Sequence, residues 1–362
     1  MTHSFSRLLA ITIVVLGIFL VQVESIQSQT FDREAMLEGM ITETILPLHT
    51  TFAEQATTLS TTALDFQADP TPETLATLQS AWVETSIAYG HIEVYRFRRV
   101  MPFINQLNSI PPNIEFIEIY IDDNVSIDAN LAASLGSQLK GLATLEYLIF
   151  TDDAISLLTG NEARMAYMSA IATDIKRVAD ELVVQWTLDA GGYGDRFLSA
   201  DGEPNSVRSS ISMLSNEMIA ILEDVTSIGL GVPLGYENRG EVQPARVYAP
   251  YSNTTRDRLV ANIEGFEMAF NGLDESPSLA DYLDFLGAEL DGEAMSTVIN
   301  QNIETTITAL DAIEQPVQIA VSEDNETVTI AYNNTLSLLR LVKTDMANQL
   351  GITVTFSDND GD

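Results

Sequence analysis

Apolar side chains recur every three or four residues over most of the chain, which is the spacing of helices with one buried face. Residues 31–66 keep this spacing throughout and predict one long amphipathic helix with a kink near Pro47. Thr71 followed by Pro72 has the composition of a helix start, and the helix it begins is predicted over residues 72–99. Further helices are predicted over residues 127–150, 162–188, 206–228, 254–272, 278–286, 294–313 and 327–350. The pattern therefore predicts an all-α protein.

Some stretches lack the helical spacing. Residues 108–123 contain two prolines and then an isoleucine-rich run without a helical period, so we expect a short strand or an extended loop there. Residues 229–253 read as a long irregular stretch, and a loop of that length inside a compact protein is often functional. Residues 314–326 are predicted to be a loop before the last helix.

These breaks suggest a domain organisation. Residues 190–205 are rich in glycine and form the best candidate for a linker. They divide the chain into an N-terminal helical part over residues 30–190 and a C-terminal helical part over residues 205–352. Residues 353–362 form an acidic tail.

Residues 1–25 have the composition of a secretory signal peptide. Arg7 gives a positively charged start, and the apolar run over residues 8–23 is slightly shorter than the roughly 20 residues that span a membrane. We therefore expect cleavage of this segment and a periplasmic or other extracytoplasmic location. The protein would be held at a membrane only through this segment, if it stays uncleaved.

The charge and the absence of cysteine exclude several classes of function. Asp and Glu number 52 against 17 Lys and Arg, which gives a net charge of −35. Nucleic acid is excluded as a partner because its binding requires a basic surface. The acidic residues are spread along the chain, which favours a solvated surface adapted to salt over a dedicated cation-capturing cluster. Without cysteine, the chain has no disulfide, thiolate metal site, thiol nucleophile or lipid-modified cysteine.

One acidic residue stands out in an otherwise apolar run. Glu146 lies within residues 136–150, GSQLKGLATLEYLIF, which we expect to be a mostly buried helix. A buried carboxylate is costly unless it is paired or hydrogen-bonded, so Glu146 needs a specific partner. Gly141 is a poor helix former, which indicates that another group comes close to the backbone at this position.

The run GLATLEYLIF at residues 141–150 resembles the imelysin-like family of exported proteins, which includes iron-regulated and insulin-cleaving-peptidase-like members. The family signature is Gly-x-His-x-x-Glu, and one branch carries GLxxLEYLLF. Residues 78–101, 250–272 and 350–362 are similar to other family segments, in the same order. The resemblance implies two up-down helical bundles related by a pseudo-two-fold axis.

The chain departs from the family signature at its histidine, which is replaced by Ala143. A His and a Glu three residues apart share one helix face and could hold a metal together. Here Glu146 alone is the candidate metal ligand, for iron or another divalent cation. The resemblance implies a non-catalytic periplasmic binding or accessory role linked to iron uptake. A metallopeptidase-like enzyme and a module that binds an envelope protein partner are the alternatives.

Several charged residues could complete a site around Glu146. The other candidates for ligand or metal binding are Gly141, Glu93, His91, Arg96, Arg99 and Arg256. Arginine forms bidentate pairs with carboxylates, so we expect Arg96, Arg99 or Arg256 to be the partner of Glu146. Such a pair would either lock two helices together or belong to a ligand site. The chain carries no GxSxG, Walker, GxGxxG or HExxH motif, and no catalytic residue is assigned.

Overall fold

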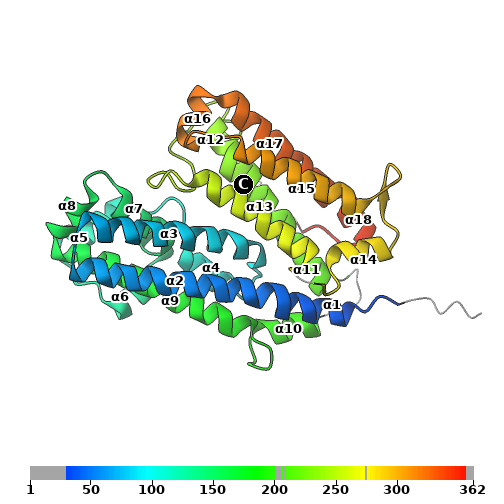
Figure 1. Ribbon diagram of the computed structural model, residues 1–362, viewed down its shortest axis with the longest axis horizontal. Helices are drawn as coiled ribbons and strands as arrows, with labels where there is room; N and C mark the ends of the chain where they lie inside the picture. Colours follow the sequence, from blue (N-terminus) through cyan, green and yellow to red (C-terminus); the bar gives the residue numbers. More distant parts are fainter. Residues whose placement is uncertain (1–29, 201–205, 207–208, 274, 356–362) are drawn as a thin grey trace, which may run out of the picture. The chain divides into compact units, whose positions relative to one another are not determined.

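The computed structural model describes residues 30–200, 206, 209–273 and 275–355 (Figure 1). The chain divides into a short unit, Met1–Phe31, and a unit over Asp32–Asp362 that contains all the helices described below. The expected signal peptide and most of the acidic tail lie outside the described residues. Within the described part of the chain, no helix is both long enough and apolar enough to cross a membrane.

The structure is mostly helical, as predicted. The first half contains α1 (Arg33–Gly39), a π-helical segment (Met40–Ile45), α2 (Leu46–Ala68), α3 (Pro72–Ile92), α4 (Met101–Leu107), α5 (Ile114–Asp122), α6 (Ala129–Ser134), α7 (Gly141–Phe150), α8 (Ala154–Thr159), α9 (Glu162–Trp186) and α10 (Tyr193–Ser199). Short 3-10 turns lie at Glu93–Tyr95 and Ser137–Leu139.

The second half is also helical. It contains α11 (Ser210–Glu223), a π-helical segment (Asp224–Gly231), α12 (Val232–Leu234), α13 (Thr255–Asn271), α14 (Leu279–Phe285), the antiparallel pair β1 (Glu289–Leu290) and β2 (Glu293–Ala294), α15 (Met295–Asp311), α16 (Val317–Glu323), α17 (Asn325–Arg340), a π-helical segment (Leu341–Met346) and α18 (Ala347–Leu350).

The helices pack as two groups. In the first group α2 lies between α3 and α9, and α7 packs on α9 and α3; in the second group α15 packs on both α13 and α17 (Figure 1). The groups meet where α13 lies along α3. Small residues permit this close contact, because a Cβ atom on Gly265 would lie 2.6 Å from the carbonyl oxygen of His91. All these helices belong to one compact unit. The division into two separate domains therefore stays a prediction.

The predicted helix starts and stops are best confirmed at their capping residues. Thr71 accepts a hydrogen bond from the Thr74 backbone N–H (3.2 Å), and the Thr74 hydroxyl accepts one from the Thr71 N–H (3.0 Å), which completes a capping box. The long first helix is continuous from α1 to α2, and its π-helical segment ends directly before Leu46 and Pro47. Helix α3 ends at Ile92 and is therefore shorter than the helix predicted over residues 72–99.

The prediction of a strand or loop over residues 108–123 is wrong for residues 114–122, which form α5. Helix α5 begins after Asn113, whose side chain caps it. Ile117 and Ile121 are buried one helical turn apart, whereas Ile119 between them is exposed. The exposed isoleucine obscured the helical period in the sequence.

Other irregular stretches also contain helices. The proposed linker at residues 190–205 includes α10, which is held in place because Phe197 packs on the ring of Trp186 (centroids 5.9 Å apart). The expected loop at residues 314–326 contains α16, and the stretch at residues 229–253 begins with helical residues up to Leu234. The predicted helix over residues 127–150 is interrupted before α7.

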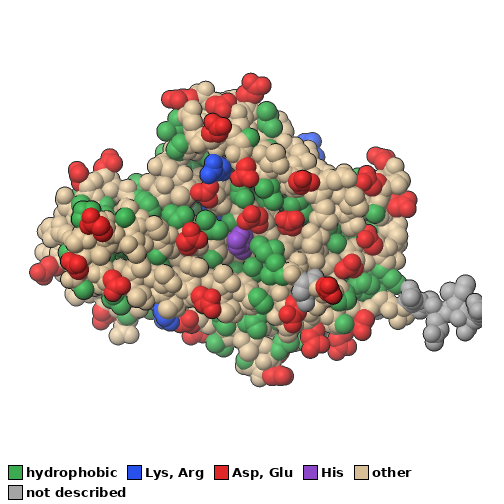
Figure 2. All heavy atoms as spheres, viewed as in Figure 1, with side chains coloured by type: hydrophobic (Ala, Val, Ile, Leu, Met, Phe, Trp, Pro, Cys, Tyr) green, Lys and Arg blue, Asp and Glu red, His purple; other side chains and the backbone are tan. Residues whose placement is uncertain are grey.

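The acidic residues are distributed as the sequence suggested. Figure 2 shows acidic side chains scattered over the visible face, with few basic ones among them. This distribution agrees with a solvated acidic surface.

The backbone at Gly141 gives a direct test of how α7 begins. Gly141 has φ +81°, and a Cβ atom there would lie 2.3 Å from the carbonyl oxygen of Leu107. We expect Gly141→Ala to lower the free energy of unfolding by roughly 3 kcal/mol in urea denaturation, because it adds both left-handed strain and a backbone clash. The control is Gly136→Ala, whose Cβ would meet no atom within 4 Å at a φ of −61°. Equal effects of the two substitutions would contradict this role of Gly141.

Candidate functional site

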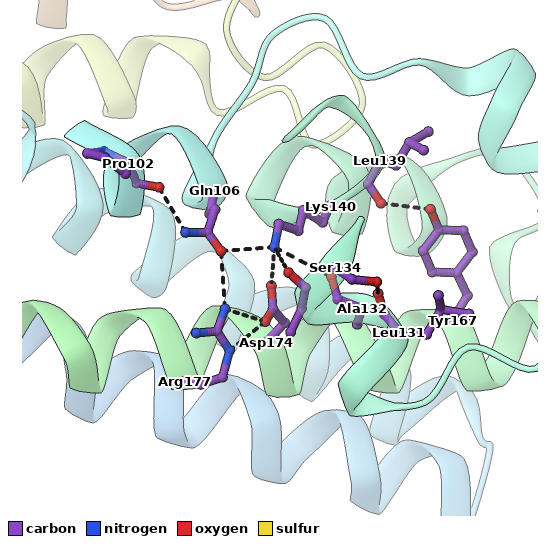
Figure 3. Close-up of polar contacts among 11 residues, drawn as sticks. Pro102, Gln106, Leu131, Ala132, Ser134, Leu139, Lys140, Tyr167, Asp174 and Arg177 are labelled. Atoms are coloured by element: carbon purple, nitrogen blue, oxygen red, sulfur yellow. Dashed lines mark hydrogen bonds and ion pairs between the residues drawn. The ribbon is translucent and has the colours of Figure 1, made fainter. Parts of the chain in front are cut away.

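The start of α7 is held by a buried lysine that the sequence analysis did not single out. The side chain of Lys140 is 2% exposed, and its Nζ donates to Gln106 Oε1 (3.0 Å) and the Ala133 carbonyl (2.9 Å) (Figure 3). The same Nζ forms an ion pair with Asp174 on α9 (3.2 Å), and Arg177 pairs with Asp174 as well (2.8 Å). The signal in the sequence was a lysine, one of only three, inside an apolar run. This network ties the residue before α7 to α4, α6 and α9.

Helix α3 fixes the rest of α7. The Trp82 indole N–H donates to the Leu142 carbonyl (3.0 Å), and the Gln79 amide donates to the Ile149 carbonyl (2.7 Å). Trp82 also packs edge-on against the ring of Phe150 (5.3 Å). Because α7 is bound at both ends, the side chain of Glu146 is set in a defined position.

Glu146 is held by the loop that precedes α13. Its side chain is 1% exposed, and its Oε1 accepts hydrogen bonds from the backbone N–H of Tyr251 (3.0 Å) and from the N–H and hydroxyl of Ser252 (2.8 Å each). The Ser252 hydroxyl is also 2.9 Å from Thr254 Oγ1. The prediction of an arginine partner for Glu146 is therefore wrong. Three neutral donors on one loop satisfy the oxygen that we expected to meet a guanidinium.

The second carboxylate oxygen of Glu146 differs from the first. No described residue donates a hydrogen bond to Oε2. Glu146 lines a cavity of about 220 Å³. Ala143, one helical turn before Glu146 on α7, lines the same cavity.

The cavity walls are mainly apolar and aromatic. They come from the segment before α5, from α7, from the π-helical segment and α12, and from the loop before α13: Ile110, Pro111, Pro112, Ile114, Ala143, Glu146, Ile228, Val232, Ala245, Arg246, Val247, Tyr248, Pro250 and Tyr251. Glu146 and Arg246 are the charged members of this lining. Few polar groups in an apolar hollow are typical of small-molecule sites. The irregular stretch that the sequence marked as functional supplies the wall from Ala245 to Tyr251.

Burial changes the proton affinity of Glu146. Loss of hydration raises its pKa from 4.5 to about 7, although the hydrogen bonds from Ser252 and Tyr251 act in the opposite direction. A carboxyl group with this pKa is partly protonated at neutral pH. A positively charged ligand would favour its ionised form, so ligand binding and proton release are expected to be coupled.

Two other predicted site residues, Glu93 and Arg96, lie in a different cluster, where the end of α3 meets the second group of helices. Glu93 pairs with Arg258 (2.7 Å) and accepts from the Asn262 amide (2.8 Å). Burial alone would raise the pKa of Glu93, but Arg258 and Arg96 outweigh it and hold that pKa below its usual value. Arg96 pairs with Asp224 of the π-helical segment.

The remaining candidates lie apart from Glu146. His91 pairs with Glu264 (2.9 Å), Arg256 pairs with its neighbour Asp257 (2.8 Å), and Arg99 is exposed. None of the candidate residues forms a hydrogen bond or ion pair with Glu146. The sequence thus predicted that Glu146 is buried and needs partners, but it did not identify the groups around it.

The residues at Glu146 do not form a metal centre by themselves. Among the residues that the structure describes, no three His, Cys, Asp or Glu side chains come together to hold an ion. Glu146 would supply one oxygen ligand, and the rest of a coordination shell would have to come from backbone carbonyls, water or the ligand itself. This donor set does not fit a resident iron site of side-chain ligands.

Because its pKa is raised, Glu146 makes the free energy of unfolding depend on pH. Between pH 4.5 and about 7 the folded state binds a proton at Glu146 that the unfolded state does not, so the free energy of unfolding falls as the pH rises through this range. Glu146→Gln keeps an acceptor oxygen for the loop and removes this titration. We expect the stability of the variant relative to wild type to increase by on the order of 3 kcal/mol from pH 4.5 to pH 8 in urea unfolding.

A matched control for this measurement is Glu115→Gln on the exposed face of α5. The control should show little change in relative stability over the same pH range. A Glu146→Gln effect that is the same at both ends of the range would contradict the buried, proton-binding state of this carboxyl.

Known proteins share this fold. An imelysin-like protein from Psychrobacter arcticum 273-4 superimposes with a TM-score of 0.74 at 16% identity, over 90% of this chain and 99% of the other. A protein from Parabacteroides distasonis ATCC 8503, provisionally named iron-regulated protein A precursor, gives a TM-score of 0.70 at 20% identity, over 86% of this chain and 94% of the other. No curated protein matches the sequence. The sequence profile of the family described as Imelysin matches residues 45–342, most of the chain, and the protein therefore belongs to the imelysin family.

Proposed function

We propose that this protein is an exported, non-catalytic binding or accessory protein, with the Glu146 cavity as its ligand site. The observation that carries the proposal is a buried carboxylate with one oxygen held by the loop before α13 and the other oxygen without a hydrogen bond from the described residues. The mostly apolar walls offer few groups that compete for Glu146, which favours an electrostatic contact between Glu146 and a ligand. The ligand is expected to present a positive charge or a hydrogen-bond donor to Glu146.

The setting of this function is proposed from two other features. Residues 1–25 have the composition of a signal peptide, which supports a location outside the cytoplasm. The structural neighbour named for iron regulation supports a link to iron or metal uptake. A metal ion at Glu146 is one form of the proposed ligand, and it would require further ligands beyond the described acidic and histidine side chains.

The donor arrangement favours binding over hydrolysis. The peptidase-type motif would need a metal-binding histidine at position 143, where this chain has Ala143. The two histidines in the described residues are engaged elsewhere, His49 with the Ile45 carbonyl (2.7 Å) and His91 with Glu264. Neither histidine of the described residues is therefore hydrogen-bonded to Glu146 or to Ser252 as a general base would be.

The test is a thermal-unfolding panel on wild type, Glu146→Gln and the exposed control Glu115→Gln. The panel contains ferrous, ferric, zinc and calcium ions together with small organic amines. We expect at least one cation to raise the melting temperature of wild type and of the control, and the shift to vanish in Glu146→Gln. Binding at 100 times Kd corresponds to about 2.7 kcal/mol of stabilisation, so the shift is measurable.

Two outcomes would contradict the proposal. One is a panel in which every shift is the same in wild type and Glu146→Gln, which would leave the cavity without a binding role. The other is metal-dependent cleavage of an unfolded polypeptide that is lost in Glu146→Gln, which would support the enzyme alternative.

A further inference from the structure

We propose that the Glu146 cavity binds a small amphipathic zwitterion, of the kind formed by an α-amino acid with an apolar side chain. The inference rests on the proposed function, because it takes this cavity as the ligand site. In this arrangement the ligand ammonium meets Glu146, its carboxylate meets Arg246, and its apolar part lies against the walls.

The first step concerns the ammonium group. The free oxygen of Glu146 is a strong acceptor for a charged donor in a hollow with mostly apolar walls. The rings of Tyr248 and Tyr251 belong to the same lining, and aromatic faces attract cations. A carboxylate combined with aromatic rings is suited to an organic ammonium. A bare metal ion would instead require several oxygen or nitrogen ligands.

The second step concerns Arg246. It is exposed, lines the same cavity and forms no ion pair with any described residue. The positive charge of Arg246 would repel a ligand that is only cationic, and more so a divalent ion. A ligand that also carries a carboxylate converts this repulsion into attraction, because guanidinium binds carboxylates through paired hydrogen bonds.

The third step concerns size and polarity. The cavity volume of about 220 Å³ is below the roughly 300–1,000 Å³ of sites for drug-sized ligands. A single amino acid is therefore a more suitable ligand than a peptide or a large cofactor. The walls supplied by Ile114, Ile228, Val232 and Val247 match an aliphatic or aromatic side chain on that ligand.

The test is isothermal titration calorimetry on the full chain with three groups of probes. The first group is L-valine, L-leucine and L-phenylalanine. The second contains two fragments of leucine: 3-methylbutylamine, which lacks the carboxylate, and 4-methylpentanoate, which lacks the ammonium. The third is the metal ions alone. We expect at least one amino acid to bind wild type, and each leucine fragment to bind at least about tenfold more weakly than leucine.

Three variants locate the two ends of the ligand. Glu146→Gln should weaken amino-acid binding at least about tenfold. Arg246→Gln should weaken amino-acid binding but leave the affinity for 3-methylbutylamine unchanged or higher, because the repulsive charge is gone. The control is Arg239→Gln, which removes an exposed arginine of the same loop that does not line the cavity and should change nothing. Circular dichroism of each variant confirms that it is folded.

The outcomes separate this inference from the proposed function. Metal binding that depends on Glu146, without amino-acid binding, would overturn the zwitterion and leave the proposed function intact. The same holds if 3-methylbutylamine binds as tightly as leucine, because Arg246 would then have no role. Absence of binding by all three amino acids to folded wild-type protein would also overturn the zwitterion, whereas the proposed function fails only if no ligand depends on Glu146.

Discussion

The burial of the Glu146 carboxylate is the constraint on which the rest of this site depends. The side chain of Glu146 is 1% exposed, and burying a carboxylate without any hydrogen bond would cost much free energy of folding. One oxygen is satisfied by Tyr251 and Ser252, so the loop before α13 must close over α7. The same contact joins the two groups of helices, because α7 belongs to the first and α13 to the second. The cavity beside Glu146 is formed where these two parts come together.

A second polar cluster stabilises that junction without taking part in the proposed site. Arg258 extends from α13, pairs with Glu93 and lies over the ring of Tyr89, with its guanidinium carbon 4.3 Å from the ring centre. Asn262, fully buried, donates to the Gly90 carbonyl (3.1 Å). Removing one partner of such a buried pair leaves an unpaired buried charge and strongly destabilises the fold. These residues therefore favour the observed contact between α3 and α13. Of the charged residues that the sequence singled out, Glu93 and Arg96 form their ion pairs in this region and not with Glu146.

The sequence predicted the elements whose signals are local. The helix start at Thr71, the helix end near residue 272 and the apolar spacing of the long helices are set by neighbouring residues, and the structure confirms them. The prediction of a strand or an extended loop over residues 108–123 failed at residues 114–122, because an exposed isoleucine obscured a helix whose burial is decided by tertiary contacts. The need for a partner at Glu146 could be inferred from its apolar neighbours. The identity of that partner could not be inferred, because backbone N–H groups are present at every non-proline residue and leave no trace in the sequence.

The account depends most directly on the ionisation of Glu146, and carbon NMR of the glutamate carboxyl groups measures it. The resonance that disappears in Glu146→Gln identifies the group. In the free protein it should titrate near pH 7, which is the pKa that burial imposes, and addition of a bound cationic or zwitterionic ligand should move the transition to lower pH. A transition near 4.5 in the free protein, unchanged by any ligand, would contradict both the buried state of Glu146 and its role in binding.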